Sequence, residues 1–213
     1  MILTFDPSTF FKVLNDHMKL ISAFFLVLLL AACSGGVTRD GDVLFEAGKY
    51  QQAITAYNSY LEENQADETT LYNRGRSYEE LGKYGLALKD FESVLGINER
   101  NVNAHLSTAS VLYNQEKFSS ALVAVGKALE LNENSAQGNF LQGRCRHQLG
   151  YFDAALESYS LAIKINSEFG EAYLYRGALK VQLNKGRLAC EDFVKANNLK
   201  VTEAKAALTK FCK

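Results

Sequence analysis

The sequence has one proline, no tryptophan and no excess of either charge. Pro7 is the only proline among 213 residues, and proline interrupts helices because its ring removes a backbone donor and clashes with the preceding turn. Alanine, leucine, glutamate and lysine are frequent after residue 45, so the body of the chain favours helices. The 23 basic and 24 acidic residues nearly cancel, which argues against a nucleic-acid surface or a polybasic membrane patch.

A strongly apolar run lies near the amino terminus. The segment 18–32, MKLISAFFLVLLLAA, has a short basic start before the apolar residues, which is the layout of a secretory signal. It is too short for a membrane-spanning helix, which needs about 20 apolar residues. Its end, LAAC at 30–33, resembles the bacterial lipobox, in which Cys33 is acylated and becomes the first mature residue. The segment 1–17 adds two acidic residues and a proline ahead of this signal, which favours Met18 as the start of translation.

This resemblance divides the amino-terminal region into a signal peptide, 1–32, and a lipidated cysteine with a short flexible tether, 33–36. Two alternatives stay open, namely an ordinary signal peptide cut elsewhere and a buried apolar helix with a chance cysteine. By resemblance to such lipoproteins in bacteria with two membranes, Ser34 after the cysteine favours the outer membrane. The expected location is therefore a lipid-anchored protein at the outer membrane, facing the periplasm.

The rest of the chain repeats every 34 residues without a gap. Small residues recur at row positions 8 and 20, and aromatic or apolar residues recur at position 24. Position 20 is alanine in every row. The rows are 34–67, 68–101, 102–135, 136–169 and 170–203. Position 8 holds Gly41, Gly75, Ala109, Gly143 and Gly177, and position 24 holds Tyr57, Phe91, Val125, Tyr159 and Phe193.

This pattern resembles the tetratricopeptide repeat. The resemblance implies an all-α, right-handed superhelix in which small residues let two antiparallel helices approach and each pair covers the next. The five helix-turn-helix repeats would occupy 37–203, and 204–213 would form a capping helix. Glycine at position 15, in Gly48, Gly82 and Gly150, predicts the end of the first helix. The usual proline after the second helix is missing, and we interpret Asn64, Asn98, Asn132 and Asn166 as substitute stops in the left-handed conformation.

Two cysteines near the carboxyl terminus are candidates for a disulfide. Cys190 lies eleven residues before Val201 and Cys212 lies eleven after it, so a turn near Val201 between antiparallel helices would bring the sulfurs together. The alternative is two small residues that never pair. Cys145 falls on an inner face and is expected to be inert.

Catalytic chemistry finds little support in the motifs. Cys145 and His147 are two residues apart, so on a helix they point to different faces and cannot jointly hold a metal. His105 is expected to pack between helices. No phosphate loop, nucleophile elbow or dinucleotide fingerprint appears. We therefore predict no enzyme, no cofactor and no metal.

Binding is expected on the concave groove that the first helices line in tetratricopeptide proteins, at row positions 2, 5, 9 and 12. The lysine–asparagine clamp of the chaperone-type subfamily is absent from these positions. Phe140 and Arg144 are the predicted anchors, with Arg144 meeting an acidic group. The alternative is ordinary helix surface. The candidate groove residues are Tyr72, Arg76, Leu106, Tyr113, Phe140, Arg144, His147, Leu174 and Val181.

The expected function is a protein–protein interaction scaffold or assembly factor in the periplasm. Its partners would be a protein or peptide in the groove and the membrane through the amino-terminal lipid, with no nucleic acid. An alternative is an accessory subunit that recruits a cell-wall or secretion enzyme to the outer membrane. A cell-wall hydrolase would need a converging pair of acids that the sequence does not offer.

Overall fold

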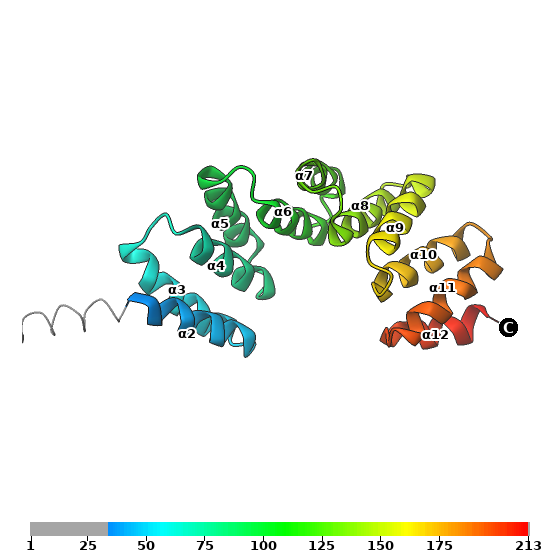
Figure 1. Cartoon of the computed structure of the whole chain (residues 1–213), viewed down its shortest axis with the longest axis horizontal. Coiled ribbons are helices and arrows are strands. Elements are labelled where there is room, and N and C mark those ends of the chain that lie inside the picture. The colour runs from blue at the N-terminus through cyan, green and yellow to red at the C-terminus, as the bar shows by residue number, and fades with distance from the viewer. Residues whose placement is uncertain (1–33, 213) are drawn as a thin grey trace, which may run out of the picture. The chain divides into compact units, whose positions relative to one another are not determined.

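The computed structural model describes residues 34–212, and these residues form helices without a strand (Figure 1). The predicted signal peptide and Cys33 lie outside the described residues. The all-α repeat class that the sequence predicts is confirmed. The described helices are α2 (Ser34–Glu46), α3 (Tyr50–Glu63), α4 (Glu68–Glu80), α5 (Tyr84–Ile97), α6 (Val102–Asn114), α7 (Phe118–Leu131), α8 (Ala136–Gln148), α9 (Phe152–Ile165), α10 (Gly170–Gln182), α11 (Gly186–Asn198) and α12 (Thr202–Phe211).

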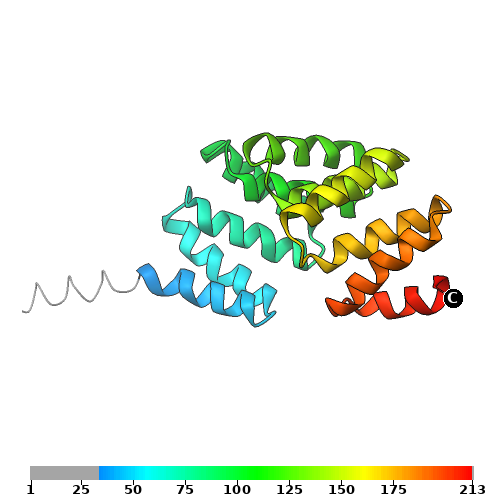
Figure 2. The ribbon, with the colours of Figure 1, turned by 45° about the vertical axis from the view of Figure 1, so that its right-hand side comes forward.

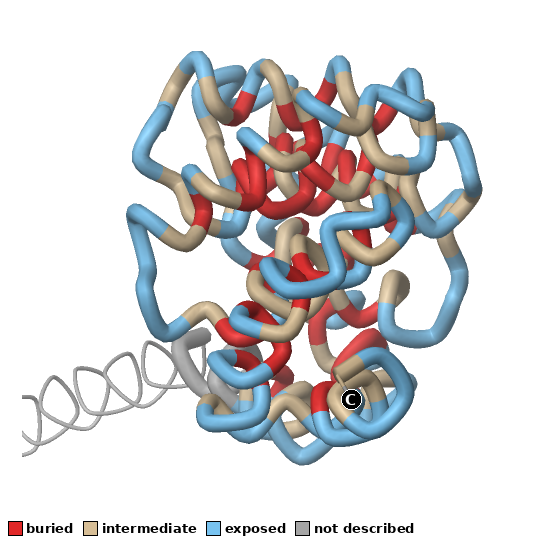
Figure 3. Tube along the Cα trace, turned by 90° about the vertical axis from the view of Figure 1, so that its right-hand side faces the viewer, coloured by how far each residue is buried: buried red, intermediate tan, exposed pale blue. Residues whose placement is uncertain are grey.

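The structure divides between Gln65 and Ala66 into two compact units. The first unit holds the antiparallel pair α2 and α3, and the second holds α4 to α12. In the second unit, each first helix packs against its own partner, and α6, α8 and α10 also pack against the second helix of the preceding repeat (Figure 2). Buried residues lie where helices meet, and exposed residues lie on the outward turns (Figure 3). Stacking of neighbouring pairs therefore supplies the core of this unit.

The predicted boundaries at the two ends need correction. Helix α2 begins at Ser34, so residues 34–36 form its first turn and not a separate tether. The reason is the register, because the other four first helices begin at the same row position. The carboxyl-terminal helix spans Thr202–Phe211 and not 204–213, because a turn at Lys200 ends the preceding helix early.

Row position 8 of a first helix lies directly against the side chain at position 24 of its partner helix. A Cβ atom added at Gly75 would lie 2.6 Å from Cε1 of Phe91, and one at Gly143 would lie 2.7 Å from Cδ1 of Tyr159. Both rings are fully buried. The glycine therefore provides the space that the aromatic ring at position 24 fills.

The third row reaches the same fit with a different pair of residues. Ala109 replaces the glycine and Val125 replaces the ring, and both are fully buried. A larger residue on the first helix is thus matched by a smaller one on the second, as close-packed interiors require.

Turns between the paired helices use the left-handed conformation at row position 15. Gly82 and Gly150 have φ angles of 67° and 80°, just after the ends of α4 and α8, as the sequence predicts. Glu116 and Asn184 occupy the same position in other rows with φ angles of 60° and 58°. The left-handed turn is therefore conserved in these rows although glycine is replaced.

The asparagines at the ends of the second helices do not use that conformation, so the predicted left-handed stop is wrong. Asn64, Asn98, Asn132 and Asn166 cap their helices with φ angles of −123°, −140°, −147° and −132°. The side chain gives the physical reason. Oδ1 of Asn98 accepts the Arg100 amide at 3.1 Å, and Oδ1 of Asn166 accepts the Glu168 amide at 3.0 Å. In these two rows the asparagine keeps an extended backbone, and its side-chain hydrogen bond to the amide two residues later forms the turn.

A disulfide joins the last two helices. Cys190 of α11 and Cys212 at the end of α12 are bonded, with Cα atoms 5.7 Å apart. Helix α12 has a single fully buried residue, Ala204, and its Phe211 ring stacks on Phe193 with centroids 6.1 Å apart. The bridge therefore holds a helix that has little core packing of its own.

We predict that the glycine–aromatic pairs are energetically coupled. Gly75→Ala should lower the free energy of unfolding by about 1–3 kcal/mol, because the methyl group overlaps the Phe91 ring. Adding Phe91→Val reproduces the pairing of the third row and should recover part of that loss, with a coupling energy of about 0.5–3 kcal/mol in urea denaturation. Gly85→Ala is the matched control, because no neighbour lies within 4 Å of its added Cβ. Purely additive effects would contradict the proposed fit.

We also predict that the disulfide stabilises the chain. Replacing both Cys190 and Cys212 by serine should lower the free energy of unfolding by about 3 kcal/mol in the chain-entropy model. Wild-type protein in reductant should unfold at the same denaturant concentration as this variant. Peptide mapping without reductant should recover the linked pair. Two free thiols in protein isolated from an oxidising periplasm would show that the bridge does not form there.

Candidate functional site

One face of the second unit is lined by first helices and carries a hollow of about 440 Å³. Its walls come from α4, α6 and α8, through residues at row positions 2, 5, 6, 9 and 12. The hollow therefore lies where the sequence predicts the groove. Its lining includes Tyr72, Arg76, Glu79, Leu106, Ser110 and Arg144.

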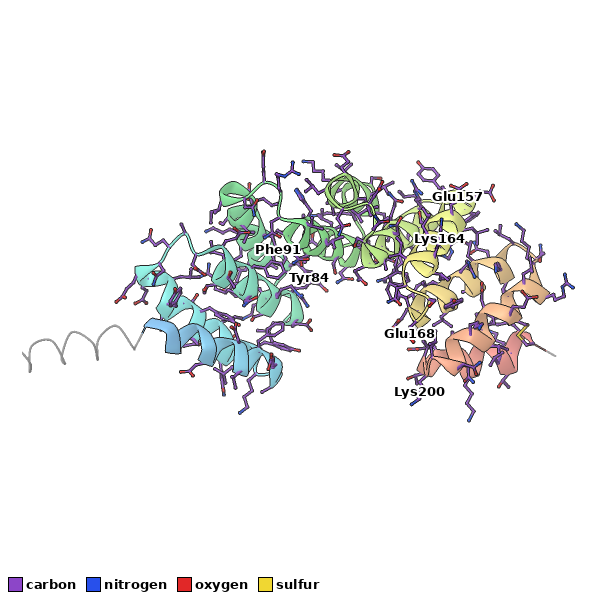
Figure 4. The ribbon with its side chains drawn as sticks, in the orientation of Figure 1. Tyr84, Phe91, Glu157, Lys164, Glu168 and Lys200 are labelled. Atoms are coloured by element: carbon purple, nitrogen blue, oxygen red, sulfur yellow. A yellow bond between two sulfur atoms is a disulfide. The ribbon has the colours of Figure 1, made fainter. Side chains whose placement is uncertain are left out.

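A second hollow of about 710 Å³ lies between α10 and α12. Glu171, Leu174 and Ala178 line it from positions 2, 5 and 9 of their row, so it belongs to the same face as the first hollow. Helix α12 forms the opposite wall with Ala206, Ala207, Lys210 and Phe211. Glu168 and Lys200, which also line this hollow, are labelled in Figure 4. The sequence predicted α12 as a cap, but its part in the groove was missed.

The candidate groove residues fall into two sets. Tyr72, Arg76, Leu106, Phe140 and Arg144 line the first hollow, and Leu174 lines the second. The other three candidates, Tyr113, His147 and Val181, are half-buried and line neither hollow.

Neighbouring side chains account for two of the residues outside the hollows. Tyr113 lies against the guanidinium of Arg144. The Nε2 atom of His147 lies 3.0 Å from Oε1 of Gln182, in the next first helix. Both side chains thus connect successive rows of this face.

The α4 end of the groove is polar and internally paired. Ser110 donates a hydrogen bond to Oε1 of Glu79 at 2.7 Å, and Nε of Arg76 lies 3.4 Å from Oε2 of the same carboxylate. Burial raises the pKa of Glu79, and both neighbours act against that rise. The hydroxyl groups of Tyr72 and Ser107 lie 3.2 Å apart across α4 and α6. The Ser110–Glu79 and Tyr72–Ser107 contacts tie adjacent repeats together.

Phe140 lines the first hollow but is largely a core residue, and its role as a binding anchor stays a prediction. Its side chain is 6% exposed. Its ring centroid lies 4.8 Å from that of Phe169, 5.4 Å from Tyr175 and 6.0 Å from Tyr159. The physical reason is the row that follows, whose aromatic residues close over position 5. Truncation of Phe140 would remove core packing and is not a clean test of binding.

Arg144 lies at the junction of three first helices. Its guanidinium carbon is 4.1 Å from the ring centroid of Tyr113 on α6 and 5.3 Å from that of Tyr175 on α10. The Phe140 ring centroid lies 5.8 Å away. Tyr175 was missed from the sequence because its row position 6 is not among the usual groove positions.

The remaining candidate groups have structural surroundings. Cys145 is a buried free thiol, and burial raises its pKa to about 11. His105 is buried, with Nε2 2.9 Å from the carbonyl oxygen of Glu99. Within residues 34–212 no cluster of three or more His, Cys, Asp or Glu side chains is placed to hold a metal ion. No helix among the same residues has the length and apolar character to cross a membrane.

Solved structures with the same helical-repeat fold are similar to this chain. MamA from Desulfovibrio magneticus RS-1 superimposes with a TM-score of 0.70 at 18% identity, over 78% of this chain and 94% of that one. The protein TTC0263 from Thermus thermophilus gives 0.68 at 23% identity, over 83% and 100%. YrrB, a protein described as having an unusual peptide-binding site, gives 0.63 at 23% identity, over 82% and 90%. These identities establish likeness of fold alone.

The comparison of sequence families is more direct. No curated protein was found to match the chain. The family model for the tetratricopeptide repeat matches residues 39–102, 72–135 and 106–171, which together span more than half of the sequence. The chain therefore belongs to the tetratricopeptide repeat family.

Proposed function

We propose that the protein is a membrane-anchored tetratricopeptide lipoprotein that scaffolds or assembles other proteins in the periplasm, by binding alone. The observation that carries the binding role is the face with two hollows, which presents successive first helices of the second unit. Its size and mixed polar and apolar lining suit an extended or helical protein segment.

The apolar part of the groove provides the contact area in this proposal. Leu106 in the first hollow and Leu174 in the second stand at the same row position and are half-buried. Exposed apolar residues on the second helices, such as Val123 and Leu161, do not line either hollow. Concave surfaces with apolar residues at equivalent positions are typical of interaction sites, whereas single exposed ones are common on any protein.

Membrane anchoring rests on the sequence of the amino-terminal region. The signal layout of 18–32 and the cysteine at its end support acylation of Cys33. The repeats then begin directly after the anchor, so the proposal puts the first of them next to the membrane. Partners would be collected at the membrane surface.

Groove variants test the binding role. Chemical crosslinking in membranes, followed by purification and mass spectrometry, would first identify a partner. We then expect Leu106→Lys and Leu174→Lys each to weaken partner affinity by about 1–3 kcal/mol in a binding titration, because a charge replaces apolar contact. Val123→Lys is the control, since this side chain is 64% exposed on α7. Circular dichroism would verify folding of all three. Loss of affinity in the control alone would place the interface on the second helices.

The lipid anchor has a separate test. Cys33→Ala should release the protein from the membrane fraction or leave an uncleaved precursor, because several acyl chains hold a membrane far more firmly than one myristoyl group does. Fractionation and mass measurement of the mature amino terminus would distinguish these states. A variant that is processed and still sediments with membranes like the wild type would rule out the lipobox.

A further inference from the structure

Arg144 is an arginine without an acceptor among the described residues. Its Nε atom is buried and makes no hydrogen bond, and no ion pair is formed by the side chain within residues 34–212. Two arginines of the second unit with carboxylate partners differ in this respect. Arg74 and Arg176 each contact both carboxylate oxygens of an aspartate, Asp90 and Asp192, at 2.6–3.0 Å. A guanidinium that is partly withdrawn from water normally requires such a partner.

Aromatic stacking holds the Arg144 guanidinium without using its donors. Tyr113 and Tyr175 lie within 4.1 Å and 5.3 Å of its central carbon, measured to the ring centroids. Aromatic faces attract the positive charge, but they do not accept the in-plane N–H bonds as a carboxylate does. The stacking therefore fixes the plane of the guanidinium, and the half-buried side chain lines the first hollow.

We propose that Arg144 forms a subsite for a side-chain carboxylate of the partner, an aspartate or glutamate within the bound segment. Arg144 lines the first hollow, and a planar carboxylate matches the fork of N–H groups on arginine. The nearby carboxylate, Glu79, is already engaged by Arg76 and Ser110. This inference rests on the proposed binding function and specifies the chemistry of its ligand.

The extent of the groove favours a side chain over a terminal carboxylate. Arg144 lines the first hollow from α8, and its guanidinium lies against Tyr175 of α10, which lines the second hollow. A segment that follows the groove therefore continues past Arg144 in both directions. A chain that ended there would leave one of the hollows unused.

Peptide selection with the full lipidated protein in lipid nanodiscs tests the subsite. The probe is a library of random peptides, each about 12 residues long, held between two folded domains so that neither end is free. We expect the enriched peptides to share an aspartate or glutamate, and replacement of that residue by its amide to weaken binding by about tenfold. A second library with free carboxyl termini separates the two carboxylate sources. Stronger binding through the terminal carboxylate would overturn the side-chain assignment.

Variants of the protein complete the design. Arg144→Gln should weaken the acidic peptide by about tenfold and leave its amide counterpart unchanged. The control Arg187→Gln removes an equal charge from an exposed site on α11 and should have no effect.

Failure of the subsite differs from failure of the binding function. If no peptide is enriched, or if Leu106→Lys leaves binding intact, the groove is not a binding site and both proposals fall. If peptides bind and Leu106→Lys abolishes binding, but Arg144→Gln affects the acidic peptide and its amide equally, the groove is confirmed and the carboxylate subsite is wrong.

Discussion

The contact between row position 8 of a first helix and row position 24 of the second determines how closely each pair can pack. Four rows meet this constraint with glycine against an aromatic ring, and one row meets it with alanine against valine. Because the interior is close-packed, neither residue can change alone without overlap or a cavity. The fixed spacing lets the next pair of the second unit stack in register, and that register brings the same row positions of successive first helices to one face.

The groove is formed mainly by row positions of the first helices that are not used for packing within a helix pair. Positions 8, 20 and 24 are buried within each pair. Positions 2, 5, 9 and 12 supply most of the first hollow and part of one wall of the second. The division is not strict, because Phe140 at position 5 is covered by aromatic residues of the next row. Arg144, one turn further along α8, remains at the groove and stacks on tyrosines from both neighbouring helices. A repeat array thus produces individual sites when bulky residues differ between rows.

The repeat register and the helix ends at position 15 could be predicted from the sequence because they depend on contacts within one repeat. The burial of Phe140 could not, since it depends on the sizes of Phe169 and Tyr175 in the next row. The asparagine stops were assigned to the right residues with the wrong conformation, because asparagine can end a helix either by a left-handed turn or by a side-chain bond to the backbone. The wall that α12 adds to the groove required the angle at which the last helices meet.

Site-specific photo-crosslinking in bacterial membranes tests most directly whether this face is the binding surface. A photoreactive phenylalanine analogue would replace Gln137 or Ala178, two exposed residues that line the hollows, and separately Val123 or Leu161, exposed residues of the second helices. The account predicts a defined protein adduct from Gln137 and Ala178 and none from the other two positions. Adducts that form only from Val123 and Leu161 would contradict it, because the partner would then occupy the opposite set of helices.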